Sequence, residues 1–123
     1  MGIIRFLMTI KKPDERVRNS VESAVAWIKG AKLTGIRQVL AYRLETPTRK
    51  DKIIINDTEA PPLWARFYDL RTEQPFFCSR DGIPRNSIDK ISYERRNGYS
   101  WIGEYARNLL SNDYPKWKKE NTR

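Results

Sequence analysis

The sequence has 123 residues, of which 39% are hydrophobic and 32% are charged, and its formal net charge is +9. One cysteine and no histidine exclude an internal disulfide, Ser-His and Cys-His triads and the usual Cys/His zinc sites. The length predicts a single domain segment over residues 1–123. The basic excess favours a polyanionic partner: nucleic acid, an anionic membrane surface or an acidic polysaccharide.

The chain is predicted to begin with two helices. Residues 3–10 are almost wholly apolar, which predicts a buried helix. Pro13-Asp14-Glu15 predicts the start of the second helix, because proline suits the first turn and acidic groups suit the positive end of the helix dipole. Gly30 is a natural stop. Between these limits, apolar residues recur at helical spacing: Val17, Val21, Ala24, Val25 and Ile28. Segment 3–10 is the simplest packing partner for this apolar stripe.

Extended structure is expected in the middle of the chain. Residues 33–58 favour extended or irregular structure with a basic loop, TPTRKDK, at 46–52. LWARFYDL and QPFFCSRD then predict one β-hairpin near residues 63–81. One register of this hairpin sets Arg66 opposite Ser79. Another sets Arg66 opposite Arg80, which requires a bound anion because opposed like charges destabilise a sheet.

The C-terminal third is predicted to be helical. One helix is expected from Asn86 or Ser87 to Asn97-Gly98, and a last helix over residues 99–110. Residues 114–123 are basic and are expected to form a frayed tail.

No export or membrane signal is recognisable. MGIIRFLMTI is short, is interrupted by Arg5 and lacks a small-residue cleavage site after it. No run approaches the roughly 20 apolar residues of a membrane span. We therefore expect no signal peptide in this chain and no membrane partner.

Several long segments carry a resemblance to a known family. GIIRFLM, VESAVAWIKGAKLTGIR, PPLWARFYD, PFFCSRDG and YERRNGY resemble, in order, the C-terminal part of family 10 pectate lyases. The resemblance runs from Gly2 to about Gly103. It implies a mainly α fold, part of an (α/α) toroid-like domain with the one β-hairpin near 63–81.

The resemblance also implies an activity. Members of this family are secreted enzymes that cleave polygalacturonate by β-elimination and depend on Ca2+. Their proposed arginine base and acidic Ca2+ site are expected to precede this segment. No catalytic residue and no metal ligand is therefore assigned here. We expect the 123-residue chain to be an incomplete enzyme that needs the N-terminal part of the domain.

Matching positions suggest where the substrate binds. Arg66 of WAR and Arg80 of RDG are implied to hold galacturonate carboxylates through planar, bidentate donor forks. Four weaker candidates each have a structural alternative. Asp81 could instead form a turn, and Arg96 could instead complement a helix end. Tyr68 and Tyr99 could instead pack in the core. The alternative function is a small basic nucleic-acid-binding domain. The ordered match and the absence of a nucleic-acid-binding motif argue against it.

Overall fold

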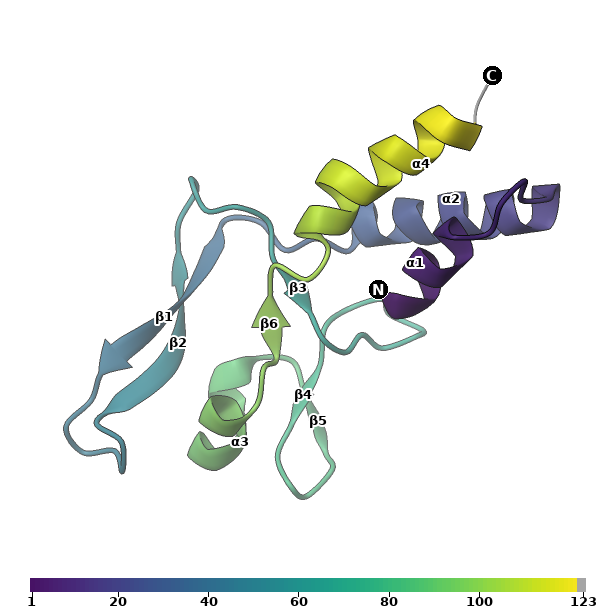
Figure 1. Ribbon diagram of the computed structural model, residues 1–123. Coiled ribbons are helices and arrows are strands. Elements are labelled where there is room, and N and C mark those ends of the chain that lie inside the picture. The colour runs from purple at the N-terminus through teal and green to yellow at the C-terminus, as the bar shows by residue number, and fades with distance from the viewer. Residues whose placement is uncertain (122–123) are drawn as a thin grey trace. The chain divides into compact units, whose positions relative to one another are not determined.

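A computed structural model describes residues 1–121. The chain divides into two compact units, and the single domain segment expected over residues 1–123 stays a prediction. Unit 1 combines the N-terminal residues 1–32 with the C-terminal segment that starts at Tyr105, and unit 2 is residues 33–104. Figure 1 shows the helices of unit 1 and the short strands of unit 2. Within residues 1–121, every helix is too short or too polar to cross a membrane.

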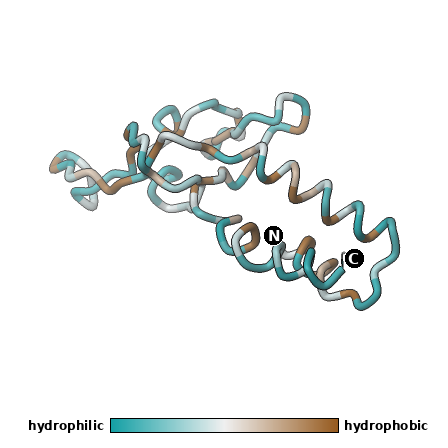
Figure 2. The backbone as a smooth tube through the Cα atoms, turned by 90° about the horizontal axis from the view of Figure 1, so that it is seen from above, coloured by the Kyte–Doolittle hydropathy of each residue, from teal (hydrophilic) through white to brown (hydrophobic). Residues whose placement is uncertain are grey.

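Unit 1 is helical. It contains α1 (Gly2–Met8), α2 (Glu15–Gly30), a π-helical turn η2 (Leu109–Asp113) and α4 (Tyr114–Asn121). The predicted start and end of α2 are confirmed. Asp14 caps this helix, and its Oδ1 accepts a hydrogen bond from the backbone N of Val17 at 2.9 Å. Hydrophobic stretches alternate with polar ones along α2 in Figure 2. Its apolar stripe supplies Val21 and Val25, which pack with Trp117 in the core.

Two predictions for unit 1 need correction. Helix α1 forms as predicted but has no buried residue. Ile4, Leu7 and Met8 pack against the core, whereas Ile3 and Phe6 are 80% and 67% exposed. Residues 114–121 form α4 instead of a frayed tail, because Trp117 is buried and Lys118 Nζ donates to Glu22 Oε1 at 2.9 Å. Residues 122–123 of the predicted tail lie outside the described residues.

Unit 2 begins with a regular hairpin. Strand β1 (Ile36–Tyr42) pairs antiparallel with β2 (Lys50–Asn56), from Ile36 opposite Asn56 to Tyr42 opposite Lys50. The extended structure predicted for residues 33–58 is therefore present. The predicted basic loop spans the turn and the start of β2. Arg49 adopts a left-handed φ of 63° in this turn, and its carbonyl accepts from the backbone N of Arg43 at 2.8 Å.

The hairpin predicted near residues 63–81 forms only as a short tip over residues 67–76. Strand β3 (Trp64–Ala65) pairs with β6 (Ile102–Gly103), and β4 (Phe77–Cys78) pairs with β5 (Pro84–Arg85). At the tip, Tyr68 lies opposite Pro75, the backbone N of Asp69 donates to the carbonyl of Gln74 at 2.9 Å, and the backbone N of Phe76 donates to the carbonyl of Phe67 at 3.2 Å. Neither predicted register forms, because the outer part of each arm pairs with a strand that lies later in the chain.

The C-terminal helices of unit 2 also differ from prediction. The helix expected from residue 86 is split into a 3-10 turn η1 (Ile88–Lys90) and α3 (Tyr93–Gly98), because Ser92 is extended and caps a new start. Part of the helix expected over 99–110 is β6. The core of unit 2 gathers around Trp101, and its buried members are Leu63, Phe77, Ile88, Ile91, Trp101 and Ile102.

The predicted fold class is therefore wrong. Among residues 1–121, unit 2 is built from three two-stranded sheets with two short helical segments, and no helical toroid is present. The physical reason is composition: residues 33–58 and 63–85 are rich in β-branched and aromatic side chains, which favour strands over helices.

Candidate functional site

Two arginine side chains converge on one aromatic ring in unit 2. The guanidinium carbon of Arg66 lies 4.8 Å from the ring centroid of Tyr99, and that of Arg95 lies 5.4 Å from the same centroid. Arg95 is also 5.7 Å from the centroid of Trp101. Cation–π contacts of this kind contribute about 0.5–1 kcal/mol at exposed positions. Within residues 1–121, neither guanidinium forms an ion pair with a carboxylate.

Trp101 anchors this cluster. Its side chain is only 2% exposed and its ring packs against Phe67, Phe77 and Tyr99 at centroid distances of 5.8, 5.9 and 4.8 Å. Its carbonyl accepts from the backbone N of Arg66 at 2.8 Å. Its Nε1 donates to the carbonyl of Arg95 at 2.9 Å. The backbone of both arginines is therefore tied to one buried residue.

Arg80 lies in a different contact from Arg66. Its Nε donates to Glu94 Oε1 at 2.6 Å, and the two side chains are 75% and 63% exposed. Exposed pairs of this kind are weak because solvent and salt screen them. The predicted opposition of Arg66 and Arg80 across a hairpin does not form. Their predicted roles in binding carboxylates remain predictions.

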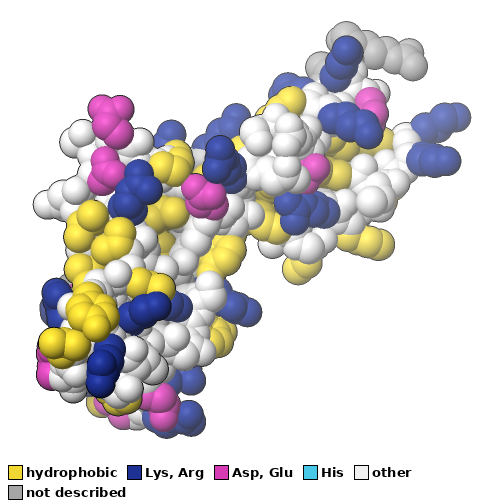
Figure 3. Space-filling model, turned by 60° about the vertical axis from the view of Figure 1, so that its left-hand side comes forward, with side chains coloured by type: hydrophobic (Ala, Val, Ile, Leu, Met, Phe, Trp, Pro, Cys, Tyr) yellow, Lys and Arg dark blue, Asp and Glu magenta, His cyan; other side chains and the backbone are white. Residues whose placement is uncertain are grey.

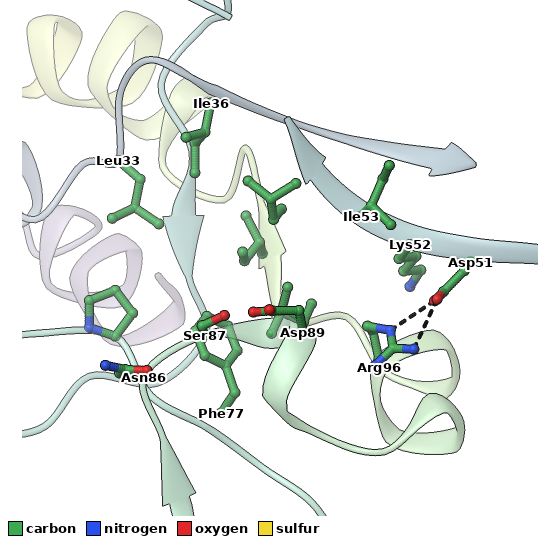
Figure 4. A pocket seen from close by; sticks show the side chains of 14 residues that line it. Leu33, Ile36, Asp51, Lys52, Ile53, Phe77, Asn86, Ser87, Asp89 and Arg96 are labelled. Carbon is green, nitrogen blue, oxygen red and sulfur yellow. Dashed lines mark hydrogen bonds and ion pairs between the residues drawn. The ribbon is translucent and has the colours of Figure 1, made fainter. Parts of the chain in front are cut away.

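Arg96 joins α3 to the β1–β2 hairpin. Its Nε and Nη2 donate to the two carboxylate oxygens of Asp51 at 2.8 and 2.9 Å (Figure 4). Its Nη1 donates to the carbonyl of Ile91 at 2.7 Å. The two side chains are 14% and 15% exposed. The hydrogen bonds from Arg96 lower the pKa of Asp51 and raise the pKa of Arg96. Asn97 adds hydrogen bonds to the same carboxylate and to the backbone of Lys52.

The other predicted residues make local contacts. Asp81 Oδ1 accepts from the backbone N of Ile83 at 3.0 Å, and Oδ2 pairs with Arg85 Nη2 at 3.1 Å. These contacts lower the pKa of Asp81, the backbone bond most of all. The hydroxyl of Tyr68 accepts from the backbone N of Ala65 at 3.0 Å, and burial raises its pKa. The contacts of Asp81 agree with its role in a turn, and those of Tyr68 agree with packing in the core. Contacts of either residue with substrate stay predictions.

A groove of about 690 Å³ lies between β2, Phe77 and residues 86–89 of unit 2. Leu33 and Ile36 line one side of it, and Phe77, Asn86, Ser87 and Asp89 line the other (Figure 4). Its cationic side chains are Lys52 and Arg96, and Arg96 is paired with Asp51. The groove is therefore less suited to a polyanion than the cluster around Tyr99.

The described residues do not fit a Ca2+ site. Ca2+ takes six to eight oxygen ligands in proteins. No group of three or more acidic, Cys or His side chains in residues 1–121 is placed to hold a metal ion. The carboxylates of Asp51, Asp81 and Glu94 are instead paired with arginines. We therefore derive no chemical step through Ca2+ on this chain.

Comparison with known families shows which family this chain belongs to. The family model described as pectic acid lyase matches residues 1–110. The chain belongs to this family. Among solved structures, the family 10 polysaccharide lyase from Cellvibrio cellulosa is 32% identical, with a TM-score of 0.73. That match covers 94% of this chain and 33% of the lyase chain.

A point mutant of that lyase, solved in complex with trigalacturonic acid, is 29% identical with a TM-score of 0.72. The match covers 99% of this chain and 35% of the mutant chain. This chain thus spans about a third of the length of the lyases that it resembles. No curated protein matches it. None of the comparisons supports the nucleic-acid-binding alternative.

Arg95 is not among the candidates selected from the sequence, whereas its neighbour Arg96 is a weak candidate there. The structure commits the Arg96 guanidinium to Asp51, whereas Arg95 lies over Tyr99 without a carboxylate among the described residues. Tyr99 follows the end of α3 with an extended backbone, so the four-residue helical spacing does not by itself predict the contact between Arg95 and Tyr99.

Proposed function

We propose that this chain is a substrate-binding region of a pectate lyase, which cleaves polygalacturonate by β-elimination. Membership of the pectic acid lyase family over residues 1–110 carries the proposal. The net charge of +9 and the two arginines without carboxylate partners at Tyr99 support it, because both favour an acidic polymer. The complex of the related Cellvibrio lyase with trigalacturonic acid supports the same substrate class.

The chemistry assigns arginines a clear task. β-Elimination removes a weakly acidic proton next to the galacturonate carboxylate, and negative charge develops there in the transition state. Guanidinium groups that neutralise this carboxylate lower the barrier, because fixed charges aimed at developing charge stabilise the transition state. Arg66 and Arg80 are the residues that we propose for this role. Arg80 must leave Glu94 in order to fill it.

We propose that the remaining groups of the reaction lie outside residues 1–121. We assign no catalytic base in these residues. The resemblance implies that an arginine base and the Ca2+ ligands belong to another part of a full-length domain. Because polygalacturonate is a polymer that does not enter cells intact, we propose an extracellular site of action.

Calorimetric titration with trigalacturonic acid tests the proposal, with the fully methyl-esterified trimer as control. The ester keeps the sugar rings but lacks the negative charges. We expect the acid to bind and the ester to bind at least about tenfold more weakly, since charged hydrogen bonds contribute roughly 1.5–3 kcal/mol each. Equal binding of acid and ester would contradict the proposal. Preferential binding of an oligonucleotide would favour the nucleic-acid-binding alternative.

Turnover is tested separately. The chain is mixed with polygalacturonate and Ca2+, with a chelator control, and the ultraviolet absorbance of unsaturated uronides is followed. We expect no rise from this chain alone. A Ca2+-dependent rise would show that the base and the metal ligands lie within the chain.

A further inference from the structure

We propose that strand β1 is a docking edge for a second copy of this chain. Two copies pair β1 against β1 in antiparallel orientation and form one four-stranded sheet, with Val39 of one copy opposite Val39 of the other. The inference goes beyond the proposed function, because it concerns assembly and uses none of the arginines proposed to bind substrate. Either proposal can therefore fail without the other.

The first argument is the direction of the backbone groups of β1. The backbone N of Arg43 donates to the carbonyl of Arg49 at 2.8 Å, and the backbone N of Asp57 donates to the carbonyl of Gly35 at 2.9 Å. Hydrogen-bonded and non-hydrogen-bonded pairs alternate along an antiparallel ladder. The outward-facing backbone groups of β1 therefore belong to every second residue: Ile36, Gln38, Leu40 and Tyr42.

This outer edge is unpaired. Within residues 1–121, the backbone groups of Gln38 and Leu40 that face outward make no hydrogen bond to another segment. The carbonyl of Tyr42 accepts only from Arg43 Nη1, at 3.3 Å. Strand β1 contains no proline, and its register with β2 runs without a bulge. An edge without these protective features is a template for another strand.

The second argument is the apolar surface on the same edge. Leu40 and Tyr42 are 62% and 65% exposed, and they share one face of the strand because they are two residues apart. In the proposed register, Leu40 lies opposite Gln38 of the second copy and Tyr42 lies opposite Ile36. Aromatic and β-branched side chains form favourable cross-strand pairs, and pairing removes apolar surface from water.

The third argument is charge, which selects the register. With Val39 opposite Val39, all seven residues of β1 are paired and Arg37 lies opposite Ala41 of the second copy. A shift that sets Leu40 opposite Leu40 would place Arg37 opposite Arg43, and opposed like charges destabilise a sheet. The antiparallel orientation also keeps the two basic hairpin turns at opposite ends of the sheet.

The assembly closes at two copies. The outer edge of β2 faces α3 (Figure 1). The backbone N of Lys52 donates to Asn97 Oδ1 at 2.8 Å, and the carbonyl of Lys50 accepts from the hydroxyl of Tyr93 at 2.8 Å. This edge is therefore occupied within the chain. Because both copies use the same edge, the contact is isologous and leaves β1 with no free side for a third copy.

Sedimentation equilibrium of the unmodified chain tests the assembly. We expect a reversible monomer–dimer equilibrium with a Kd between about 10 µM and about 1 mM, because a contact between two short strands is smaller than a standard interface. A chain that stays monomeric up to about 1 mM would overturn the proposal, and so would association that continues beyond a dimer.

The edge is tested by one substitution made at two positions. Leu40→Lys places a charge on the proposed edge, and we expect it to raise the dimer Kd about tenfold or more. Leu44→Lys is the matched control, because Leu44 is 65% exposed but lies outside β1. We expect the control to stay within about threefold of the unmodified chain. Equal losses in both variants would show that β1 is not the contact.

Disulfide cross-linking tests the register. Val39→Cys and Ala41→Cys are each made together with Cys78→Ser, which removes the native thiol. Facing residues of a non-hydrogen-bonded pair have Cα atoms about 4.5 Å apart, which a disulfide can span. We expect Val39→Cys to form a covalent dimer on oxidation. The two Ala41 positions lie four residues apart along the strand, about 13 Å, so Ala41→Cys should not cross-link. Cross-linking through Ala41→Cys, alone or equally, would overturn the register.

Salt dependence separates this contact from one made by charges. Two copies of a chain with net charge +9 repel each other. Raising sodium chloride from about 50 to about 500 mM screens this repulsion and should lower the dimer Kd. Dissociation of the dimer by salt would mean that ion pairs hold it together and would contradict pairing through β1. Urea denaturation of each variant checks that the hairpin substitutions leave the fold intact, and the cross-linking test does not depend on Leu40.

Discussion

The guanidinium of Arg80 donates to the carboxylate of Glu94 across 2.6 Å on the surface of unit 2. Glu94 comes directly before Arg95 in α3, so an acidic side chain stands next in sequence to one of the arginines at Tyr99. Figure 3 shows dark-blue cationic side chains among yellow hydrophobic ones on the visible face. Glu94 thus neutralises one of the two arginines predicted to bind substrate, and an incoming carboxylate must compete with it.

Removing that competitor should strengthen binding. Glu94→Gln keeps the size of the side chain but frees the guanidinium of Arg80. We expect the affinity for trigalacturonic acid to rise about two- to fivefold. The ligand no longer has to break the ion pair of Arg80, which contributes little free energy because it is exposed, and it is no longer repelled by the Glu94 carboxylate. Calorimetric titration measures the change. Glu59→Gln, which removes an exposed carboxylate of the same unit, controls for net charge, and an equal gain in both variants would refute a local effect.

The contact between Asp51 and Arg96 should stabilise unit 2. Asp51→Ala removes two hydrogen bonds to a guanidinium that is 14% exposed. We expect the free energy of unfolding to fall by roughly 1.5–3 kcal/mol, since hydrogen bonds to charged groups contribute that much. Urea denaturation measures it. Asp57→Ala breaks a more exposed pair with Arg37 and should cost less. Equal costs would show that burial does not strengthen the Asp51 contact.

The stability of the protein should decrease at acidic pH. Hydrogen bonds from Arg96 lower the pKa of Asp51 below its value in the unfolded chain, which is about 3.9. The contribution of Asp51 to the free energy of unfolding is therefore complete above the unfolded pKa and is lost as the pH falls through the folded pKa. The pKa values of Glu22, Asp57, Asp69 and Asp81 are lowered as well.

We therefore expect the free energy of unfolding to decrease below about pH 4. The decrease should be shallower in Asp51→Ala. Urea titrations at a series of pH values test both points. Because the chain has no histidine, no histidine-linked change is expected between about pH 5 and 8. A large step near neutrality would contradict this account.

The indole nitrogen of Trp101 should contribute to the stability of unit 2 and to ligand binding. Trp101→Phe removes the Nε1 donor and leaves the carbonyl of Arg95 without that bond. We expect a loss of about 1–3 kcal/mol in the free energy of unfolding, together with weaker binding of trigalacturonic acid. Trp117→Phe is a matched control in unit 1, because the Nε1 of Trp117 is buried without a partner. Similar losses in both variants would show that ring volume alone is responsible.

Local signals predicted part of this structure correctly. The Asp14 cap, the apolar spacing and Gly30 define α2, because capping and helical periodicity are properties of contiguous residues. The family was also recognisable, since long unusual segments such as PPLWARFYD and YERRNGY lie in order along the chain. For the candidate site, Arg66 and Tyr99 were both selected from the sequence, although not as neighbours.

Only the tertiary structure decided the rest. Trp64–Ala65 pairs with Ile102–Gly103, and Phe77–Cys78 pairs with Pro84–Arg85. Two-residue strands carry too little local preference to choose a partner. The choice follows from burying Trp101, Phe77 and Ile102 in one core. That core ties Arg66 and Arg95 to Trp101, whereas Arg80 and Arg96 are held by carboxylates elsewhere in the fold. Which arginine keeps a free charge depends on long-range packing, which no local pattern records.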